Sequence, residues 1–532
     1  MSSVFDALQN PTAALSELYE QNKPQGIDSF PSTVTSHFSA ILKPQDVFQQ
    51  IPVLDLYHPP ESFPDRSLVV FNAMVQDTSI SPELYLATRN SNECGGWGLA
   101  DEIAPNEDVQ HENLRECSTF WTVSIPGLSS WCYDENQLAP PPPYISIQKH
   151  KYPIPNTPHI GVQVKVYDEK LAQPIRTTDI MSFVGILNFE PLHSSINLPS
   201  SANVPTLHTF FCTPISRTIV PRSFPGSSLL PSIAGLRKEL IQWIADEGLG
   251  GDCIAAEWVF LCALARVRSR HPPVLPLSLT IAGFPPPPDN LETQPALYHV
   301  LSQIFPLISI LPLTLDTLNN TAFCPESKDE DLYSGRLQQP KGTVLVLTEG
   351  AITEGGIFNK GVMNIRATQD MMSEQTLQYI FPFSNFQFET EVNFLVTTEG
   401  KRSTFFKTDV TVPLRLSVSN DLKHSLYKSE EDITFPSVQK LFQFRELAGG
   451  SMIGNVAVAE ALGKHVEDDF IRERSTENDK GASVNGTTFT PDDLIQRMLV
   501  ARLVALSLHQ TEVTVDNWEN AKKLEGQTKN RV

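Results

Sequence analysis

Residues 278–290 read SLTIAGFPPPPDN, a short apolar strand that runs into four consecutive prolines. Apolar stretches of similar length return as GTVLVLT at 342–348 and as EVNFLVT at 391–397. Segments with helical periodicity accompany them, including 233–244 and the strongly apolar run at 251–266. Short buried strands that alternate with helices are typical of a parallel α/β sheet. We therefore predict an α/β core around this stretch.

The chain before this core has the pattern of a small β domain. Five segments have the composition of strands, at 68–77, 83–88, 119–125, 162–167 and 180–189. A five-stranded barrel of the OB type fits that number, and so do other small all-β domains. The residues that follow, 191–230, are rich in Ser and Pro and lack sustained periodicity, so we predict a linker there.

Helices are predicted at both ends of the chain. Asn10 and Pro11 suit a helix start, and Leu15, Leu18 and Tyr19 then give a short helix one apolar face, to pack on the body or on a partner. A proline-interrupted connection follows to about residue 64.

The tail from 420 to 532 is predicted to be helical. Thr490 is a helix cap followed by acidic residues, with an apolar face over 494–508, and we expect Trp518 to pack between helices.

Charge and composition exclude several classes of protein. The 532 residues include 40 Lys and Arg and 61 Asp and Glu, a net charge of −21 that argues against direct DNA binding and favours protein partners. The seven cysteines form no CxxC pair and have no His at ligand spacing, so we predict no metal site and a reducing compartment. We also predict no signal peptide and no membrane span.

Aromatic residues on the predicted strands permit a second interpretation. Phe71, Tyr85, Phe120 and Trp121 could stack on single-stranded nucleic acid. Few basic residues surround them and aromatic side chains on strands are usually core, so we favour a structural role.

Short motifs along the chain occur in the order found in one family. With them, the chain resembles the MCM-binding proteins, partners of the minichromosome maintenance helicase. The segment 134–161 is shorter than we expect in animal members, as in a fungal member. The matching stretches are MVQD at 74–77, VKVY at 164–167, GDCIAAE at 251–257, VEDDF at 466–470, ARLVALS at 501–507 and AKKLE at 521–525.

The resemblance implies an α+β multidomain fold related to the helicase subunits themselves. It consists of an OB-like β-barrel, a degenerate AAA+-like α/β core and a helical lid. The expected ranges are 1–60 for an N-terminal helical segment and connection, 61–190 for the OB-like domain with a loop excursion at 134–161, 191–230 for the linker, 231–418 for the core and 419–532 for the lid.

The stretch at 283–290 lacks what a phosphate-binding loop needs. Such a loop places backbone N–H groups, a Lys and a Ser or Thr around the phosphates. Prolines 285–288 supply no N–H donors, and an ungapped alignment puts Asp289 and Asn290 where Lys and Ser or Thr would lie. An acidic side chain there would repel a triphosphate.

Four other positions that the resemblance implies for ATP hydrolysis have also changed. Glu349 stands without a neighbouring Asp, Thr398 replaces an Asn, Asp492 lies where a phosphate-sensing Arg is expected, and no arginine finger is visible near 408–412. We therefore predict no enzyme activity, no catalytic residue and no cofactor. Glu349 could be a relic catalytic base, but we favour a solvated acid at the end of a strand.

The resemblance implies a non-enzymatic partner that mimics a helicase subunit. Such a protein would regulate assembly, protection or unloading of the helicase in DNA replication and sister-chromatid cohesion, in the nucleus and with a cytoplasmic pool. The alternatives are a residual ATPase or nucleotide-binding protein, and an OB-type single-stranded DNA binder. Candidate partner contacts are Glu467, Asp468 and Asp469, for which a solvated helix face is the favoured interpretation. No small-molecule substrate is expected.

Overall fold

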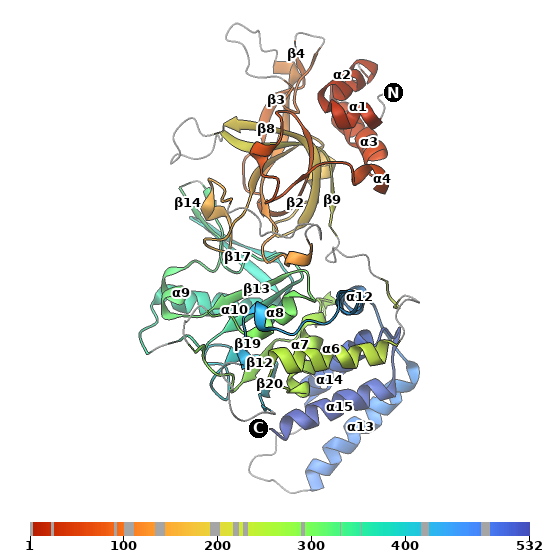
Figure 1. The fold of residues 1–532 in the computed structure, drawn as a ribbon, viewed down its shortest axis with the longest axis vertical. Helices are drawn as coiled ribbons and strands as arrows, with labels where there is room; N and C mark the ends of the chain where they lie inside the picture. Colours follow the sequence, from red (N-terminus) through yellow and green to blue (C-terminus); the bar gives the residue numbers. More distant parts are fainter. Residues whose placement is uncertain are drawn as a thin grey trace.

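Two β-rich parts lie one above the other along the long axis of the molecule (Figure 1). N-terminal helices lie beside the upper part and C-terminal helices lie beside the lower part. This computed structural model describes residues 4–22, 26–89, 93–99, 111–132, 144–191, 203–215, 223–226, 232–288, 293–329, 331–352, 354–416, 425–479 and 490–531.

The N-terminal helices cover one side of the upper part. They are α1 (Val4–Gln9), α2 (Pro11–Asn22), α3 (Phe30–Leu42) and α4 (Gln45–Phe48). Leu15, Leu18 and Tyr19 of α2 are buried, which confirms the predicted apolar face. Phe38 of α3 stacks on Phe210 with ring centroids 3.9 Å apart. The sequence predicted a connection where α3 forms, and that part of the prediction is wrong.

Strands of the upper part close into a ring. They are β2 (Leu68–Asp77), β6 (Leu114–Ser124), β7 (Gly161–Val166), β8 (Ile180–Pro191) and β9 (Asn203–Pro214). β2 pairs antiparallel with both β6 and β8, β6 pairs antiparallel with β7, and β8 pairs antiparallel with β9. β7 and β9 run parallel and complete the barrel. Phe71, Phe183 and Leu207 are buried in its core.

The barrel corrects two of the sequence predictions. The segment at 203–214 forms β9, so the predicted linker is wrong there. Phe210 packs toward the N-terminal helices while Leu207 packs into the barrel, so both faces of β9 are covered and no polar face marks it as a strand. The predicted strand at 83–88 lies outside the ring, as β3 (Glu83–Leu86), which pairs with the start of β6, and β4 (Thr88–Arg89).

The lower part contains a parallel sheet, as predicted. Its strands in the described residues are β12 (Leu279–Ala282), β13 (Ile308–Pro312), β16 (Thr343–Thr348), β19 (Val392–Thr398) and β20 (Val410–Pro413). Their order is β13-β16-β19-β12-β20, and every pair is parallel. The predicted strands at 278–282, 342–348 and 391–397 are confirmed, whereas β13 and β20 were not predicted.

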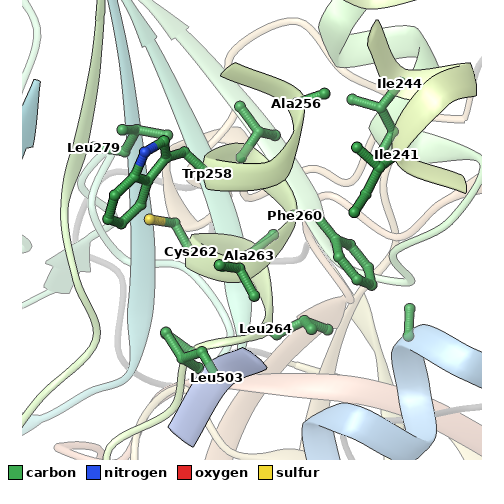
Figure 2. Close-up of a cluster of buried hydrophobic side chains, with 14 of the residues drawn as sticks. Ile241, Ile244, Ala256, Trp258, Phe260, Cys262, Ala263, Leu264, Leu279 and Leu503 are labelled. Carbon is green, nitrogen blue, oxygen red and sulfur yellow. The ribbon is translucent and has the colours of Figure 1, made fainter. Parts of the chain in front are cut away.

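Both faces of this sheet are covered, which explains its continuous apolar strands. On one face, Val344 and Val346 pack with α6 (Ile233–Gly248), α7 (Cys253–Leu264) and α8 (Ala296–Ser302). Figure 2 shows the side chains of α7 reaching toward β12 on one side and α6 on the other. On the opposite face, Leu345 and Leu347 pack with α10 (Asn359–Glu374).

Buried polar contacts join the barrel to the lower part. The lower part contributes a small sheet to these contacts. Its strands are β14 (Glu326–Lys328), β15 (Asp331–Tyr333), β17 (Thr376–Phe381) and β18 (Ser384–Glu389). Lys151 Nζ lies 3.0 Å from Asp77 Oδ2 of the barrel and 2.5 Å from Asp331 Oδ1 of β15. Gln338 donates to the Gln76 carbonyl oxygen at 2.8 Å. Because these groups are buried and paired, they fix how the two parts meet.

The C-terminal helices pack on the face of the sheet that α7 covers. They are α12 (Val438–Ile453), α13 (Glu460–Asp479), α14 (Pro491–Ser507) and α15 (Val515–Lys529). Thr490 and Asp493 form a capping box at the start of α14, which confirms the predicted cap. Trp518 is fully buried, as predicted.

The end of the chain is tied back to the core through Asp252. This residue caps α7, and its carboxylate accepts two hydrogen bonds from Arg531 at 2.5 and 2.8 Å. Burial alone would raise the pKa of Asp252, but the hydrogen bond from Arg531 and the backbone N–H groups lower it. The GDCIAAE stretch therefore has a structural role, since Asp252 joins α7 to the C-terminus.

Candidate functional site

The carboxyl ends of the parallel strands form the edge at which open α/β sheets bind their ligands. β12 ends at Ala282, β16 at Thr348 and β19 at Thr398. β12 lies between β19 and β20, whereas the next strand along the chain is β13 at the far edge. This change in strand order makes the end of β12 the position to examine for a nucleotide site.

The backbone donors that follow β12 are used within the chain. The Gly283 N–H donates to the Gly400 carbonyl oxygen at 3.1 Å, and the Phe284 N–H donates to the Thr398 carbonyl oxygen at 2.8 Å. The prolines that come next carry no N–H. Residues 283–288 therefore offer no cradle of amide donors to a phosphate, as the sequence predicted. Asp289 and Asn290 lie outside the described residues.

The proline loop is also packed in place. Phe284 is buried and lies edge to face with Tyr427, whose hydroxyl donates to the Pro285 carbonyl oxygen at 2.8 Å. A Cβ on Gly350 would lie 3.0 Å from Pro286 Cα. The loop after β12 and the loop after β16 are thus in close contact.

Glu349 is not in the solvated position that the sequence favoured. It is 5% exposed, so the solvated strand-end acid is wrong. Its carboxylate accepts from the Ser403 hydroxyl at 2.5 Å and from the Thr404 N–H at 2.9 Å. A third, longer hydrogen bond comes from the Phe405 N–H at 3.4 Å. Glu349 therefore anchors the loop after β19, and these hydrogen bonds compete with any role in orienting water.

The remaining positions considered for ATP hydrolysis are Thr398, Asp492 and the stretch near 408–412. Thr398 is buried, and its hydroxyl lies 3.4 Å from the Gly400 nitrogen. Asp492 is exposed in the first turn of α14, where the helix dipole favours an acid. Near 408–412, the Thr408 and Thr280 hydroxyls are 2.7 Å apart.

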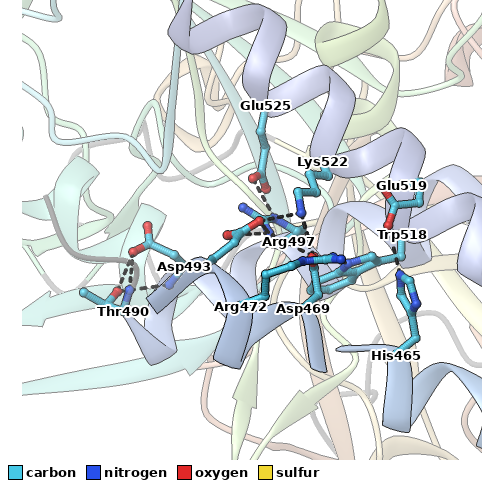
Figure 3. A network of polar contacts seen from close by, with 11 residues as sticks. His465, Asp469, Arg472, Thr490, Asp493, Arg497, Trp518, Glu519, Lys522 and Glu525 are labelled. Carbon is cyan, nitrogen blue, oxygen red and sulfur yellow. Dashed lines mark hydrogen bonds and ion pairs between the residues drawn. The ribbon is translucent and has the colours of Figure 1, made fainter. Parts of the chain in front are cut away.

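A buried arginine is present in α14, but it faces the other C-terminal helices. Arg497 is 4% exposed and contacts Glu473 of α13 at 3.1 Å and Glu525 of α15 at 2.9 Å. Figure 3 shows the side chains of three helices converging on this cluster. Burial alone would lower the pKa of Arg497, but the two carboxylates raise it. The guanidinium is thus a structural cation of the helical part.

Asp469, one of three predicted partner contacts, belongs to the same cluster. It is 1% exposed and binds Lys522 at 2.8 Å, the Trp518 indole N–H at 3.1 Å and Arg472. Burial would raise the pKa of Asp469, but the hydrogen bonds from Lys522, Arg472 and Trp518 hold it well below its ordinary value. A surface contact is wrong for this residue because the carboxylate is inside the fold.

Glu467 and Asp468 lie on the exposed side of α13. Successive helix residues are rotated by about 100°, so three consecutive acids cannot share one face. The sequence run could not separate the buried acid from its two exposed neighbours. Partner contact through Glu467 and Asp468 stays a prediction.

The aromatic residues considered as stacking platforms lie in the core. Phe71, Phe120 and Trp121 are buried. Tyr85 lies edge to face with Tyr167 at 4.8 Å between ring centroids. These rings are therefore occupied by packing, which favours the structural interpretation.

The described residues contain neither a metal-binding cluster nor a membrane-spanning helix. No group of three or more His, Cys, Asp or Glu side chains there is placed to hold a metal ion. No described helix combines the length and apolar character needed to cross a membrane.

This chain is similar to known proteins along most of its length. A family model described as mini-chromosome maintenance replisome factor matches residues 38–142 and 134–532. The mini-chromosome maintenance complex-binding protein of Gallus gallus is 24% identical over 643 aligned residues, covering 100% of this chain and 98% of that protein. The Homo sapiens protein of that name is 23% identical over 648 residues, with 99% and 98% covered. The Arabidopsis thaliana protein is 26% identical over 402 residues, with 69% and 62% covered.

Proposed function

This chain belongs to the mini-chromosome maintenance replisome factor family, and we propose that it is a non-enzymatic binding partner of the minichromosome maintenance (MCM) helicase. The relatives in Gallus gallus and Homo sapiens are named as MCM complex-binding proteins. One observation carries the non-enzymatic part of the proposal. At the sheet edge where an ATPase would hold phosphate, Gly283, Phe284 and Glu349 are engaged by the chain itself.

We further propose that the two β-rich parts are an OB-like domain and a degenerate AAA+-like core. A closed ring of strands with one parallel pair supports the first assignment. The second is supported by the parallel sheet, whose changed positions lie at the ends of β12, β16 and β19. The helices over 438–529 would then be the lid. With β9 in the ring, the OB-like domain extends past the expected boundary at 190 to Pro214, and the expected ranges 231–418 and 419–532 follow from the other assignments.

Mimicry of a helicase subunit is the mechanism that we propose. Related subunits of a ring pack through equivalent surfaces, so a chain with a subunit's fold competes for those surfaces. A competitor that cannot hydrolyse ATP would regulate assembly, protection or unloading of the ring. We place this activity in DNA replication and sister-chromatid cohesion, in the nucleus with a cytoplasmic pool.

A pull-down of the purified chain with MCM subunits tests this function. The subunits are offered singly and as the assembled hexamer, with and without ATP. We expect binding that needs no nucleotide. Preference for free subunits would support a role in assembly or storage, and displacement of a subunit from the hexamer would support unloading.

Three outcomes would contradict the proposal. No binding to any form of the helicase would remove the proposed partner. Binding of the chain to single-stranded DNA with a steep salt dependence would instead favour the OB-type DNA binder. Magnesium-dependent ATP binding by the purified chain would favour a residual ATPase.

A further inference from the structure

The loop after β19 displays cations in a strongly acidic protein. Lys401, Arg402 and Lys407 are exposed, and none of these side chains has a partner within the residues that the structure describes. The whole chain carries 61 acidic residues against 40 Lys and Arg. Three unpaired cations on one loop are therefore a local reversal of the protein's charge.

These cations line a hollow together with apolar side chains and Glu399. The hollow has a volume of about 610 Å³ and lies beside the ends of β12 and β20. Phe406 and Leu414 supply apolar surface, and Lys401, Arg402 and Lys407 line it as well. Such a hollow suits a ligand that carries negative charge next to an apolar group.

The loop is held at both of its ends and in its middle. The Gly400 carbonyl oxygen accepts from Gly283, and Glu349 binds Ser403 and Thr404 as described above. The Gln369 side chain accepts from the Lys407 N–H at 2.8 Å and donates to the Lys407 carbonyl oxygen at 3.2 Å.

At the far end of the loop, Asp409 accepts from the Ser278 N–H and hydroxyl, both at 2.7 Å. A loop fixed at these points has little backbone entropy left to lose on binding.

We propose that this hollow docks an acidic segment of a protein partner. Carboxylates of the segment would meet Lys401, Arg402 and Lys407, and an adjacent apolar side chain would lie against Phe406 and Leu414. The inference rests on the proposed function, since the partner is an MCM subunit. The exposed acids Glu399 and Asp409 on the same loop interrupt the positive charge, which disfavours the longer basic track that nucleic acid needs.

A charge-reversal variant tests the docking site. It carries Lys401→Glu, Arg402→Glu and Lys407→Glu. The matched control carries Lys238→Glu, Lys464→Glu and Lys523→Glu, three exposed positions that change the net charge equally. Affinity for the MCM subunits that the wild-type chain binds is measured for each variant. We expect the loop variant to bind at least about tenfold more weakly and the control to stay within about twofold.

Two further measurements test whether the loop variant loses affinity through its charges and not through unfolding. Wild-type affinity should fall as salt rises from roughly 0.05 to 0.3 M, and the loop variant should show a weaker dependence. Both variants should unfold at the wild-type temperature. The neutral pair Lys401→Gln with Arg402→Gln should give an intermediate loss of affinity.

The possible failures can be told apart. Equal binding by the loop variant and the control would overturn the docking site and leave the proposed function standing. If the wild-type chain binds no MCM subunit, the proposed function fails, and a fluorescent glutamate-rich peptide then serves as the probe. Peptide binding that the loop variant loses would support the docking site, and no peptide binding would overturn it. The docking site would also be overturned if the loop variant lost only binding to single-stranded DNA and kept its affinity for MCM subunits.

Discussion

The cluster around Asp469 and the loop at 399–409 are both rich in charge, but they satisfy it in opposite ways. In the cluster, the acids Asp469, Glu473 and Glu525 face Arg497 and Lys522 across three helices. On the loop, the backbone is bound at several points while the cationic side chains extend to solvent. A charge that is paired inside the chain stabilises the fold, and a charge held without a partner is available for binding. Each prediction below tests one side of this difference.

The largest effect is expected from Asp469→Ala. The change removes the carboxylate that Lys522, Arg472 and Trp518 bind, and it leaves the indole N–H of the fully buried Trp518 without its acceptor. We expect a loss of roughly 3 kcal/mol in the free energy of unfolding, measured by urea denaturation. The exposed neighbour is the control, since Glu467→Ala should change stability by less than about 0.5 kcal/mol. Equal effects of the two changes would contradict a buried structural cluster.

The same carboxylate should make stability depend on pH in a specific direction. The pKa of Asp469 is depressed in the folded chain, so its stabilisation is full above the unfolded value of about 3.9. That stabilisation should disappear as pH falls toward the folded pKa. Asp469→Asn should therefore lose less stability between about pH 5 and pH 3 than the wild-type chain does. The free energy of unfolding is measured by urea denaturation at each pH. If it falls equally in the wild-type chain and in Asp469→Asn, this carboxylate is not the group concerned.

Replacing Glu349 should release the loop without unfolding the sheet. Glu349→Ala removes the acceptor of the Ser403 hydroxyl and the Thr404 N–H. We expect a loss of about 2 kcal/mol and faster amide hydrogen exchange at Thr404, with exchange in β16 unchanged. Glu399→Ala, on the exposed part of the same loop, should leave exchange at Thr404 as it is. Continued protection of Thr404 in Glu349→Ala would contradict the anchoring role.

The smallest effect on stability is expected on the exposed side of α13. Glu467→Lys with Asp468→Lys should leave the unfolding free energy within about 0.5 kcal/mol of wild type. If these acids contact a basic surface of the partner, the double variant should bind MCM subunits more weakly. Unchanged binding would leave them as a solvated helix face.

Patterns with a clear physical period were predictable from the sequence. The buried strands β12, β16 and β19, the helix α7 and the cap at Thr490 all appear where the sequence predicted them. Each depends on local apolar periodicity or on one capping side chain. The proline loop was equally clear, because the absence of N–H donors is a property of the residue itself.

Features that depend on distant partners were not predictable. β9 has no polar face because the N-terminal helices cover one side and the barrel interior the other. Asp469, unlike Asp468, binds Trp518 and Lys522, which lie about fifty residues away in the chain. The sequence suggested a solvated Glu349 because its donors, Ser403 and Thr404, come from the loop that follows β19.

Calorimetric titration of the purified chain with ATP and magnesium tests the central claim most directly. The account predicts no binding heat up to millimolar ATP, because Gly283 and Phe284 donate within the chain and the prolines after them cannot donate. Saturable, magnesium-dependent binding in the micromolar range would contradict it, since the phosphate site would then have survived.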